Sequence, residues 1–403
     1  MIARLDTADV AIPELAPLQR ALLVAGAAGM LVSLVGAAMN LTQFLQSYLM
    51  AYMWCLGATL GCFALGMVHQ LSGGAWGVVI RRPIGAASRL LPVMTLLFMP
   101  IAFGMGHLYS WMNVAHDEVL RHKQVYLNAP FFLARAAIYF VVWNTISYLL
   151  NAWSLEQDRT GDPRIARKMQ LLSAGGLVAY GLTITFASFD WLMSLEPHWY
   201  STIYGVLIMG GQGLTALSTL IVVLAWLSRR APLDRIVAPA HFHDLGNLML
   251  AFVMLWAYFS FSQFLIIWAG NLPAEILWYQ HRLEGSWRFV GIGLMLAHFA
   301  IPFVLLLSRS VKREPEMLLK VAGWILAIRV VDLFWLIAPE FHRDALSVSW
   351  MDIVLPLALG AVWLGGFIQQ LRGRAILPVH DPEFDETLGR IIERAAERPS
   401  TAP

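Results

Sequence analysis

The sequence predicts an all-α polytopic membrane protein, and two features of its composition carry that prediction. Of its 403 residues, 58% are hydrophobic and only 13% are charged, whereas a soluble domain carries roughly 25% charged residues. A soluble fold of this length could not bury so much apolar surface. We therefore expect membrane lipids to surround the chain. The net charge of +2 gives no reason to expect a nucleic-acid partner.

Ten apolar segments are long enough to cross a bilayer, which takes about 20 helical residues. We expect a membrane domain over 18–370, between a cytoplasmic N-terminal segment, 1–17, and a cytoplasmic tail, 371–403. No small-residue cleavage motif follows the first apolar run, so that run is predicted to be a retained helix. The third span is expected to begin late, after Arg81, Arg82 and Pro83. The predicted spans are 18–39, 44–68, 86–107, 131–152, 170–191, 199–227, 245–268, 287–307, 317–337 and 350–370.

Two helix ends share a motif, which suggests an internal repeat. The fifth span ends in FDWLMSLEPH at 189–198, and the ninth ends in DLFWLIAPEFH at 332–342. Each places an Asp in the last turns, then a Pro, a Glu and a His. Because four spans separate the motifs, both copies run in the same sense, as in parallel membrane repeats. We therefore expect two four-helix bundles, spans 2–5 and 6–9, with spans 1 and 10 peripheral. The pair Gly57-x-x-x-Gly61 predicts close helix packing in the second span.

The distribution of Lys and Arg predicts the orientation of the chain. With ten spans, both termini lie on one side, and that side carries 21 of the 28 Lys and Arg residues. The opposite side carries 6, and Arg329 lies within the ninth span. Positive charge accumulates on the cytoplasmic side of membrane proteins. We expect a protein of the bacterial inner membrane with cytoplasmic N- and C-termini.

The cysteines and histidines argue against a metal or haem bound by this chain. Cys55 and Cys62 lie in one span and form no cluster that could hold an iron–sulfur centre or a zinc ion. His298 is the one histidine near mid-membrane, and a b-type haem would need a second axial His at similar depth. We expect no haem, no iron–sulfur cluster and no metal site in this chain.

The corner between spans 5 and 6, FASFDWLMSLEPHWYSTIYG at 186–205, is the main candidate site. Asp190 lies near a helix C-terminus, where the helix dipole disfavours an anion, so a capping role is excluded. Ionisable groups at the rim of an apolar segment usually face a bundle interior or a wet cavity rather than lipid. Asp190 is the candidate catalytic residue, and the other candidate site residues are Trp191, Glu196, His198, Tyr200 and Arg135.

Ionisable residues in the spans also suggest a proton path in two halves, because charges in lipid are costly. Its inner half would begin at His69, His243 and Asp244, its outer half would use Asp190, Arg329 and Asp332, and His298 would lie nearest the gap. Structural roles compete with this interpretation. Arg329 and Asp332 are three residues apart and can pair, and Asp244 and Asp352 suit helix N-caps.

The corner at 186–205 resembles the hallmark of the NrfD-like family of membrane subunits, which includes those of polysulfide reductase. More narrowly, that corner, the segment HFHDLGNLMLAFVMLWAYFSFSQFLIIWAGNLPAEILWYQHR at 241–282 and the tail LPVHDP at 377–382 resemble the second NrfD-like subunit of Alternative Complex III. The resemblance covers nearly the whole chain. It implies two four-helix bundles with outer helices 1 and 10.

The resemblance also implies a role in a respiratory quinol:cytochrome c oxidoreductase, with a terminal oxidase as an alternative acceptor. Expected partners are a sister NrfD-like subunit and periplasmic iron–sulfur and cytochrome c subunits, which would hold the redox groups. Non-covalently bound quinol is the expected cofactor. In the sister subunit an Asp at the end of helix 5 serves a quinol site, and its position matches Asp190 here. Quinol oxidation releases protons, and it needs a carboxylate or imidazole near the hydroxyl and an apolar slot for the ring. The resemblance therefore makes Asp190 the candidate catalytic base, and the other candidate residues of the corner, with Arg135, become candidates for a quinol site.

This chain departs from the family pattern at one point, since its fourth span has no histidine that could bind quinol. Three hypotheses therefore stay open. The chain is a redox-complex subunit with or without its own quinol site, a structural anchor, or a secondary transporter. Transport is the least favoured, because no paired broken helices occur at matching midplane positions.

Overall fold

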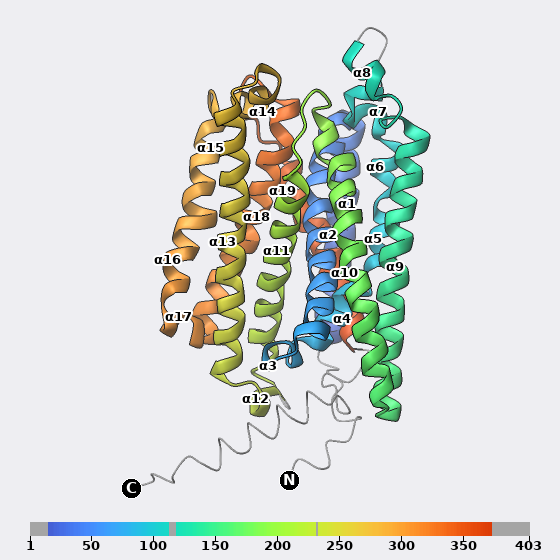
Figure 1. Cartoon of the computed structure of the whole chain (residues 1–403), viewed down its shortest axis with the longest axis vertical. Helices are drawn as coiled ribbons and strands as arrows, with labels where there is room; N and C mark the ends of the chain where they lie inside the picture. Colours follow the sequence, from blue (N-terminus) through green and yellow to red (C-terminus); the bar gives the residue numbers. More distant parts are fainter. Residues whose placement is uncertain (1–14, 113–117, 231–232, 373–403) are drawn as a thin grey trace.

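The computed structural model describes residues 15–112, 118–230 and 233–372, and the regular elements within these ranges are helices. Ten helices there are long and apolar enough to cross a membrane. The all-α polytopic fold predicted from the sequence is thereby confirmed. The tail motif at 377–382 lies outside the described residues. Helix α1 begins and helix α19 ends at the same end of the molecule, opposite α14 (Figure 1).

Eight spans are continuous helices: α1 (Leu15–Met39), α2 (Leu41–Ser72), α9 (Ala129–Thr160), α10 (Pro163–Trp191), α11 (Tyr204–Leu227), α13 (Pro239–Gly270), α18 (Pro315–Phe341) and α19 (Met351–Arg372). Two are segmented. The third span consists of α4 (Arg81–Ser88), α5 (Leu91–Leu97) and α6 (Met99–Phe103), and the eighth of α15 (Trp287–Leu294), the π-helical turn η4 (Met295–Ala300) and α16 (Ile301–Leu307). Short helices connect the spans: α3 (Ala75–Val78), α7 (Met105–Leu108), η2 (Ser110–Met112), α8 (Glu118–Lys123), η3 (Met193–Leu195), α12 (Leu233–Ile236), α14 (Pro273–Leu283) and α17 (Arg309–Arg313).

Helices α2 and α11 form the buried centre of the molecule and pack against each other. Gly61 makes this approach close, because a Cβ there would lie 2.2 Å from the carbonyl oxygen of Gln212. Helix α2 packs with α4, α5 and α10, and α9 packs with α5 and α10, which makes the first bundle. Helix α11 packs with α13 and α18, and α15 and α16 pack against α13 and α18 to complete the second bundle. The expected pair of four-helix bundles is thus present.

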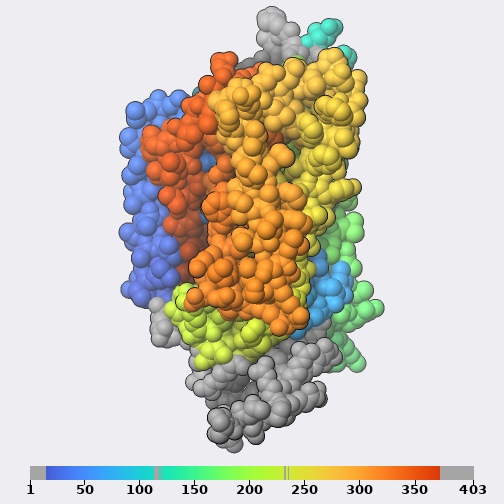
Figure 2. Space-filling view, turned by 90° about the vertical axis from the view of Figure 1, so that its left-hand side faces the viewer, coloured from blue at the N-terminus to red at the C-terminus, as the bar shows by residue number. Residues whose placement is uncertain are grey.

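Helices α1 and α19 pack along each other at the periphery, as expected for spans 1 and 10. Figure 2 shows α1 in blue beside α19 in red-orange. Small residues allow the contact: a Cβ at Gly26 or Gly29 would come within 2.7 Å of Val362 or Ala358. The pair covers α2, which leaves most of α1 facing outward.

Several predicted helix boundaries and caps are wrong. The third span begins at Arg81 rather than 86, because a proline in the first turn, here Pro83, loses no helical hydrogen bond. The sixth span begins at Tyr204 rather than 199, after a corner that is not helical. Asp244 does not cap the seventh span, which begins at Pro239. Its N-terminus is instead closed by the ring Nδ1 of His241, which accepts a hydrogen bond from the Ala238 amide at 2.9 Å.

The last span is capped as expected, although from within its first turn. Asp352 accepts a hydrogen bond from the Ser349 amide at 2.8 Å, while the Ser349 hydroxyl accepts one from the Met351 amide at 3.3 Å. This arrangement resembles a capping box, although the Ser349 hydroxyl bonds the amide of Met351 and not that of Asp352. Asp352 also accepts hydrogen bonds from Ser47 at 2.5 Å and from Gln43 at 3.3 Å, so the cap ties α19 to α2.

The π-helical turn η4 has a local cause in the sequence. Pro302 lies four residues after His298 and has no amide hydrogen, so the His298 carbonyl cannot make the usual helical bond. Such a lost bond is a recognised cause of helix distortion, and η4 ends just before the proline. The distortion sets the orientation of the His298 side chain, which points into the second bundle and is fully buried.

Candidate functional site

The ionisable residues predicted as one outer site and one proton path fall into separate clusters. We call them the Asp190 cluster (Tyr126, Arg135, Tyr139 and Asp190), the Glu196 cluster (Glu196, His281, Arg282 and Glu340) and the mid-membrane cluster (Trp256, His298, Arg329 and Asp332). The first lies in the first bundle, and the other two involve helices of the second.

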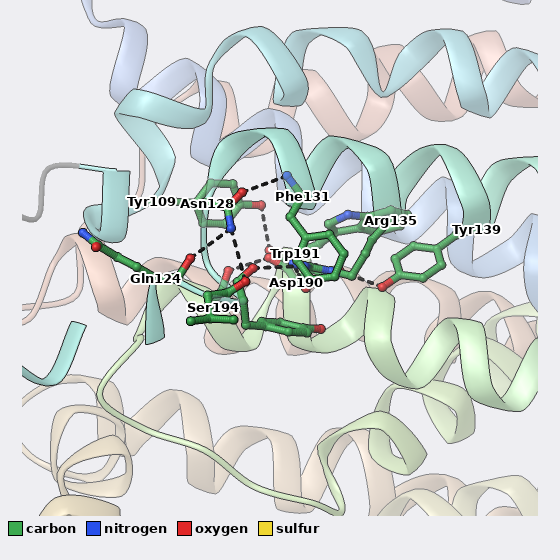
Figure 3. Close-up of polar contacts among 11 residues, drawn as sticks. Tyr109, Gln124, Asn128, Phe131, Arg135, Tyr139, Asp190, Trp191 and Ser194 are labelled. Atoms are coloured by element: carbon green, nitrogen blue, oxygen red, sulfur yellow. Dashed lines mark hydrogen bonds and ion pairs between the residues drawn. The ribbon is translucent and has the colours of Figure 1, made fainter. Parts of the chain in front are cut away.

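The Asp190 cluster is built around a buried ion pair between Arg135 and Asp190. Arg135 donates two hydrogen bonds to Asp190, from Nε to Oδ2 at 2.9 Å and from Nη2 to Oδ1 at 2.8 Å, and the Tyr139 hydroxyl donates a third at 2.7 Å (Figure 3). The exposed fraction of Asp190 is 0%. Bidentate bonds between Arg and a carboxylate are among the strongest in proteins. Asp190 therefore has a buried cationic partner, which gives it a structural role.

The start of α9 places Arg135. Asn128 caps α9 by accepting a hydrogen bond from the Phe131 amide at 2.9 Å, and Arg135 follows in the second turn (Figure 3). Its guanidinium carbon lies 3.8 Å from the ring centre of Tyr126 and 4.3 Å from that of Phe131. The Tyr126 carbonyl accepts a further hydrogen bond from Nη1 of Arg135 at 2.9 Å. These contacts hold the guanidinium by cation–π attraction and fixed geometry.

Trp191 follows Asp190 in the chain, and its side chain packs in the protein interior and does not line an open cavity. It is fully buried, and its ring packs 4.8 Å from that of Phe98 and 5.6 Å from that of Phe140. Its carbonyl accepts a hydrogen bond from the Tyr109 hydroxyl at 3.1 Å. Burial raises the pKa of Tyr109, so this phenol stays neutral. The surroundings of Asp190 are thus aromatic and tightly packed, which favours a fixed carboxylate over an exchanging base.

Glu196 turns away from Asp190 and joins the second bundle. Its Oε1 lies 3.2 Å from Nδ1 of His281, and its Oε2 lies 3.5 Å from Nη1 of Arg282. Arg282 is buried and donates hydrogen bonds to the carbonyls of Leu336 at 2.9 Å and Trp278 at 3.1 Å. Burial lowers the pKa of His281, which favours its neutral form although Glu196 acts in the opposite direction.

The remaining corner residues lie at the surface. His198 is exposed, and the exposed fraction of Tyr200 is 57%. Lys123 donates a hydrogen bond to the Pro197 carbonyl at 2.5 Å and lies 6.0 Å from the Tyr200 ring centre. The six residues predicted for a quinol site therefore do not surround one space. The quinol-site prediction grouped residues that are close in sequence. The chain passes from the first bundle to the second between Asp190 and Glu196, so these residues lie apart in the structure.

The mid-membrane cluster lies near the centre of the second bundle. Arg329 and Asp332 form the predicted ion pair along one face of α18, and the Thr215 hydroxyl accepts a hydrogen bond from Arg329 at 3.4 Å. The Arg329 guanidinium fits against Gly211, where a Cβ would lie 2.3 Å from its Nη2. A larger residue than glycine at position 211 would displace the arginine.

His298 completes this cluster without satisfying its own polar atoms. Its ring centre lies 4.1 Å from that of Trp256, in an edge-to-face arrangement, and the Arg329 charge acts on it. The residue is fully buried, and neither ring nitrogen has a hydrogen-bond partner among the described residues. Buried polar groups in proteins are nearly always hydrogen-bonded. His298 is therefore an exception that calls for a reason.

An apolar groove of about 350 Å³ covers this region on the outside of the bundle. Its lining includes Ala297, which precedes His298, and Ile328 and Val331, which flank the Arg329–Asp332 pair in sequence. The wall is completed by Phe289, Val290, Gly293 and Leu294. The groove thus follows α15, η4 and α18 at the depth of the mid-membrane cluster.

The inner residues of the predicted path have structural contacts. His69 is buried, its Nε2 lies 3.1 Å from the Gly74 carbonyl oxygen, and its ring packs 5.1 Å from that of Trp76. It therefore holds the turn between α2 and α3. His243 lies 3.7 Å from the carboxylate of Asp244, whose side chain is 50% exposed. His243 and Asp244 lie at the end of the second bundle where α13 begins, whereas His69 lies near the end of α2 in the first bundle.

Sequence analysis missed Tyr139, Arg282 and the contact between Glu196 and Glu340. Tyr139 follows Arg135 by four residues, so the two share a helix face, and this spacing was a usable signal. The convergence of Glu196, His281 and Glu340 joins three distant segments and has no counterpart in local sequence spacing.

A scan against protein-family models found no match for this chain, and a search of curated proteins found none either. The fold and the geometry of the clusters are therefore the observations from which a function is inferred.

Proposed function

We propose that this chain is a membrane subunit of a bacterial respiratory quinol-oxidising complex, related to the NrfD-like subunits of Alternative Complex III, and that it carries protons through its second bundle. The observation that supports this role most directly is His298, which is buried without a hydrogen-bond partner beside the Arg329–Asp332 pair. Imidazole can both accept and donate a proton, which is what a relay group needs.

The energetics of the membrane interior support the same assignment. An ionisable group near the bilayer centre costs at least about 2.5 kcal/mol, and such groups mark proton or ion pathways in many membrane proteins. The Arg329–Asp332 pair offsets part of this cost through its own attraction. It does nothing to satisfy the two nitrogens of His298. Under this proposal the imidazole of His298 binds a proton or a water molecule transiently and so passes protons along the path.

The proposed assembly follows from the motifs and the charge distribution of the sequence. Redox groups belong to partners, namely periplasmic iron–sulfur and cytochrome c subunits, and a sister NrfD-like subunit shares the membrane. A terminal oxidase is an alternative electron acceptor. Because 21 of the 28 Lys and Arg residues lie on the side of both termini, we place the termini in the cytoplasm and the Glu196 cluster at the periplasmic face.

A second candidate, a subunit without its own quinol site, is favoured by the Asp190 cluster. Asp190 already accepts hydrogen bonds from Arg135 and Tyr139 and has no exposed surface. A base for quinol needs an open approach to the hydroxyl. Under this proposal quinol is oxidised in the sister subunit, and Asp190 holds the first bundle together. The transporter hypothesis gains little, because the segmented spans, the third and the eighth, are not at corresponding positions of the two bundles.

Copurification tests the assignment to a redox complex. The chain, tagged at its C-terminus and expressed in its native host, would be isolated in mild detergent. We expect c-type haem absorbance and quinol:acceptor activity to follow the tag through size exclusion. An unrelated polytopic protein with the same tag is the control. If the tagged chain is pure and carries neither haem nor quinol oxidation, the proposed function is wrong.

A further inference from the structure

The Glu196 cluster joins three segments that are far apart in the sequence. Glu196 lies in the corner after η3, His281 in α14 and Glu340 in the last turn of α18. One carboxylate oxygen of each glutamate and one ring nitrogen of the histidine all lie within 4.8 Å of one another. Two carboxylates and one imidazole in this arrangement are a possible set of metal ligands, independent of the proton path proposed above.

Three buried atoms in this cluster have no hydrogen-bond partner among the described residues, namely Nδ1 of His281, Nε of Arg282 and Oε2 of Glu340. The side chain of Glu340 is only 10% exposed, and its Oε2 is buried and makes no hydrogen bond among the described residues. Leaving a buried carboxylate oxygen unpaired is costly. Placing a second carboxylate, Glu196, beside it adds repulsion between like charges. A cation between the two would relieve both costs.

Two arginines lie at the edge of the cluster, and neither fills its centre. Arg282 is held by the carbonyls of Leu336 and Trp278, and its contact with Glu196 is long at 3.5 Å. Arg343 pairs with Oε1 of Glu340 from the outside, and its side chain is 51% exposed. The arginines therefore reduce the negative charge without reaching Oε2 of Glu340.

We propose that Glu196, His281 and Glu340 bind one divalent transition-metal ion at this end of the molecule, with zinc as the most suitable probe. Ligands of a tetrahedral zinc ion lie about 3.3 Å apart, given bonds of about 2.0 Å. The Glu196–His281 separation of 3.2 Å already matches this value, and Glu340 needs to move inward. The His281 side chain is 22% exposed, which leaves an approach for the ion and for a water ligand.

A bound ion would tie α14 and the end of α18 to the corner between α10 and α11. The neighbouring rings of Trp199 and Trp278, which stack at 4.8 Å, already pack these segments together. This ligand set contains no cysteine, which is why a search for cysteine clusters predicts no metal in the chain. The metal would therefore brace the outer end of the second bundle.

Zinc binding to the purified full-length chain in detergent tests the proposal, after chelator treatment and buffer exchange. We expect one zinc ion per chain by equilibrium dialysis, with at least about tenfold weaker binding in His281→Gln and in Glu340→Gln. Two variants on different helices are used so that a folding failure in one leaves the other to decide. His122→Gln, which changes an exposed histidine of α8 at the same end, is the matched control and retains zinc.

A second readout separates a built site from zinc adsorbed on the surface. Zinc is expected to raise the melting temperature of the wild type and of His122→Gln, and to leave those of His281→Gln and Glu340→Gln unchanged. The proposal is overturned if the wild type binds no zinc, or if both cluster variants bind zinc as tightly as the wild type.

Discussion

The Asp190 cluster and the mid-membrane cluster are both buried arginine–aspartate pairs, yet their polar atoms are satisfied to different degrees. Asp190 accepts three hydrogen bonds from Arg135 and Tyr139. Asp332 pairs with Arg329, while His298 beside them has no hydrogen-bond partner. A fully satisfied polar network rigidifies a fold, whereas an unpaired buried polar group is costly. In the Asp190 cluster the carboxylate is saturated, although the Tyr126 hydroxyl has no hydrogen-bond partner among the described residues. The comparison gives Asp190 a structural ion pair and leaves His298 as the buried group for which we propose a chemical role.

Depth separates the two clusters as well. Asp190 is the second-last residue of α10, close to the membrane surface, whereas Arg329 lies near the middle of the 27-residue α18. The cost of a charge rises toward the bilayer centre. An arginine and a histidine kept at mid-depth therefore need a stronger reason than a pair near the surface.

Arg135→Leu is expected to have the largest effect on stability. It leaves the Asp190 carboxylate buried without a cation, and breaking a buried pair costs about 3–5 kcal/mol. Thermal unfolding in detergent, followed by fluorescence-detected size exclusion, measures the loss. The double variant Arg135→Leu/Asp190→Leu removes both charges and should recover most of the stability. A single variant as stable as the wild type would contradict a structural role for the pair.

Gly211→Ala should destabilise the second bundle by a smaller amount. The added Cβ would lie 2.3 Å from Arg329 and push its guanidinium away from Asp332. Overpacking of this kind costs about 1–3 kcal/mol. Gly323→Ala is the matched control, because a Cβ at Gly323 meets nothing within 4 Å. The same unfolding assay should show a lower melting temperature for Gly211→Ala alone, and equal values for both would mean that Arg329 is not confined there.

Tyr139→Phe removes one of the three hydrogen bonds to Asp190 and keeps the ring. Because Arg135 still pairs with the carboxylate, we expect a loss of about 1 kcal/mol. Tyr148→Phe, on the same helix with an exposed fraction of 73%, should change nothing measurable. The informative quantity is the difference in stability between Tyr139→Phe and Tyr148→Phe. Equal stabilities would show that the Tyr139 hydroxyl does not support Asp190.

His298→Phe is expected to have the smallest effect on stability, within about 0.5 kcal/mol of the wild type. The histidine makes no hydrogen bond that the substitution could remove, and a ring of similar size keeps the contact with Trp256. A clear fall in melting temperature would reveal a structural hydrogen bond and weaken the comparison between the clusters.

The fold could be predicted from the sequence because the length of each apolar segment is a property of a single helix. The ten spans and the Arg329–Asp332 pair were predicted in this way, since both depend on local spacing. The site was predicted less well. Glu196 lies close to Asp190 in sequence and yet joins His281 and Glu340, because the corner crosses between bundles. Contacts between distant helices depend on packing, which spacing along one chain does not encode.

The boundaries also show where local rules fail. Asp244 suited an N-cap by residue type, but Pro239 begins the helix earlier and His241 closes it. By contrast, Asp352 does take part in a helix cap, because its carboxylate accepts a hydrogen bond from the Ser349 amide just before α19.

Proton stoichiometry in His298→Phe tests the central claim most directly. The purified complex would be reconstituted in liposomes, and the protons moved per electron would be measured together with the rate of quinol oxidation. Tyr139→Phe, which alters only the Asp190 cluster, serves as the control. We predict that His298→Phe retains quinol oxidation and moves fewer protons per electron, while Tyr139→Phe keeps the wild-type value. An assembled His298→Phe complex with an unchanged proton stoichiometry would contradict a proton path through the second bundle.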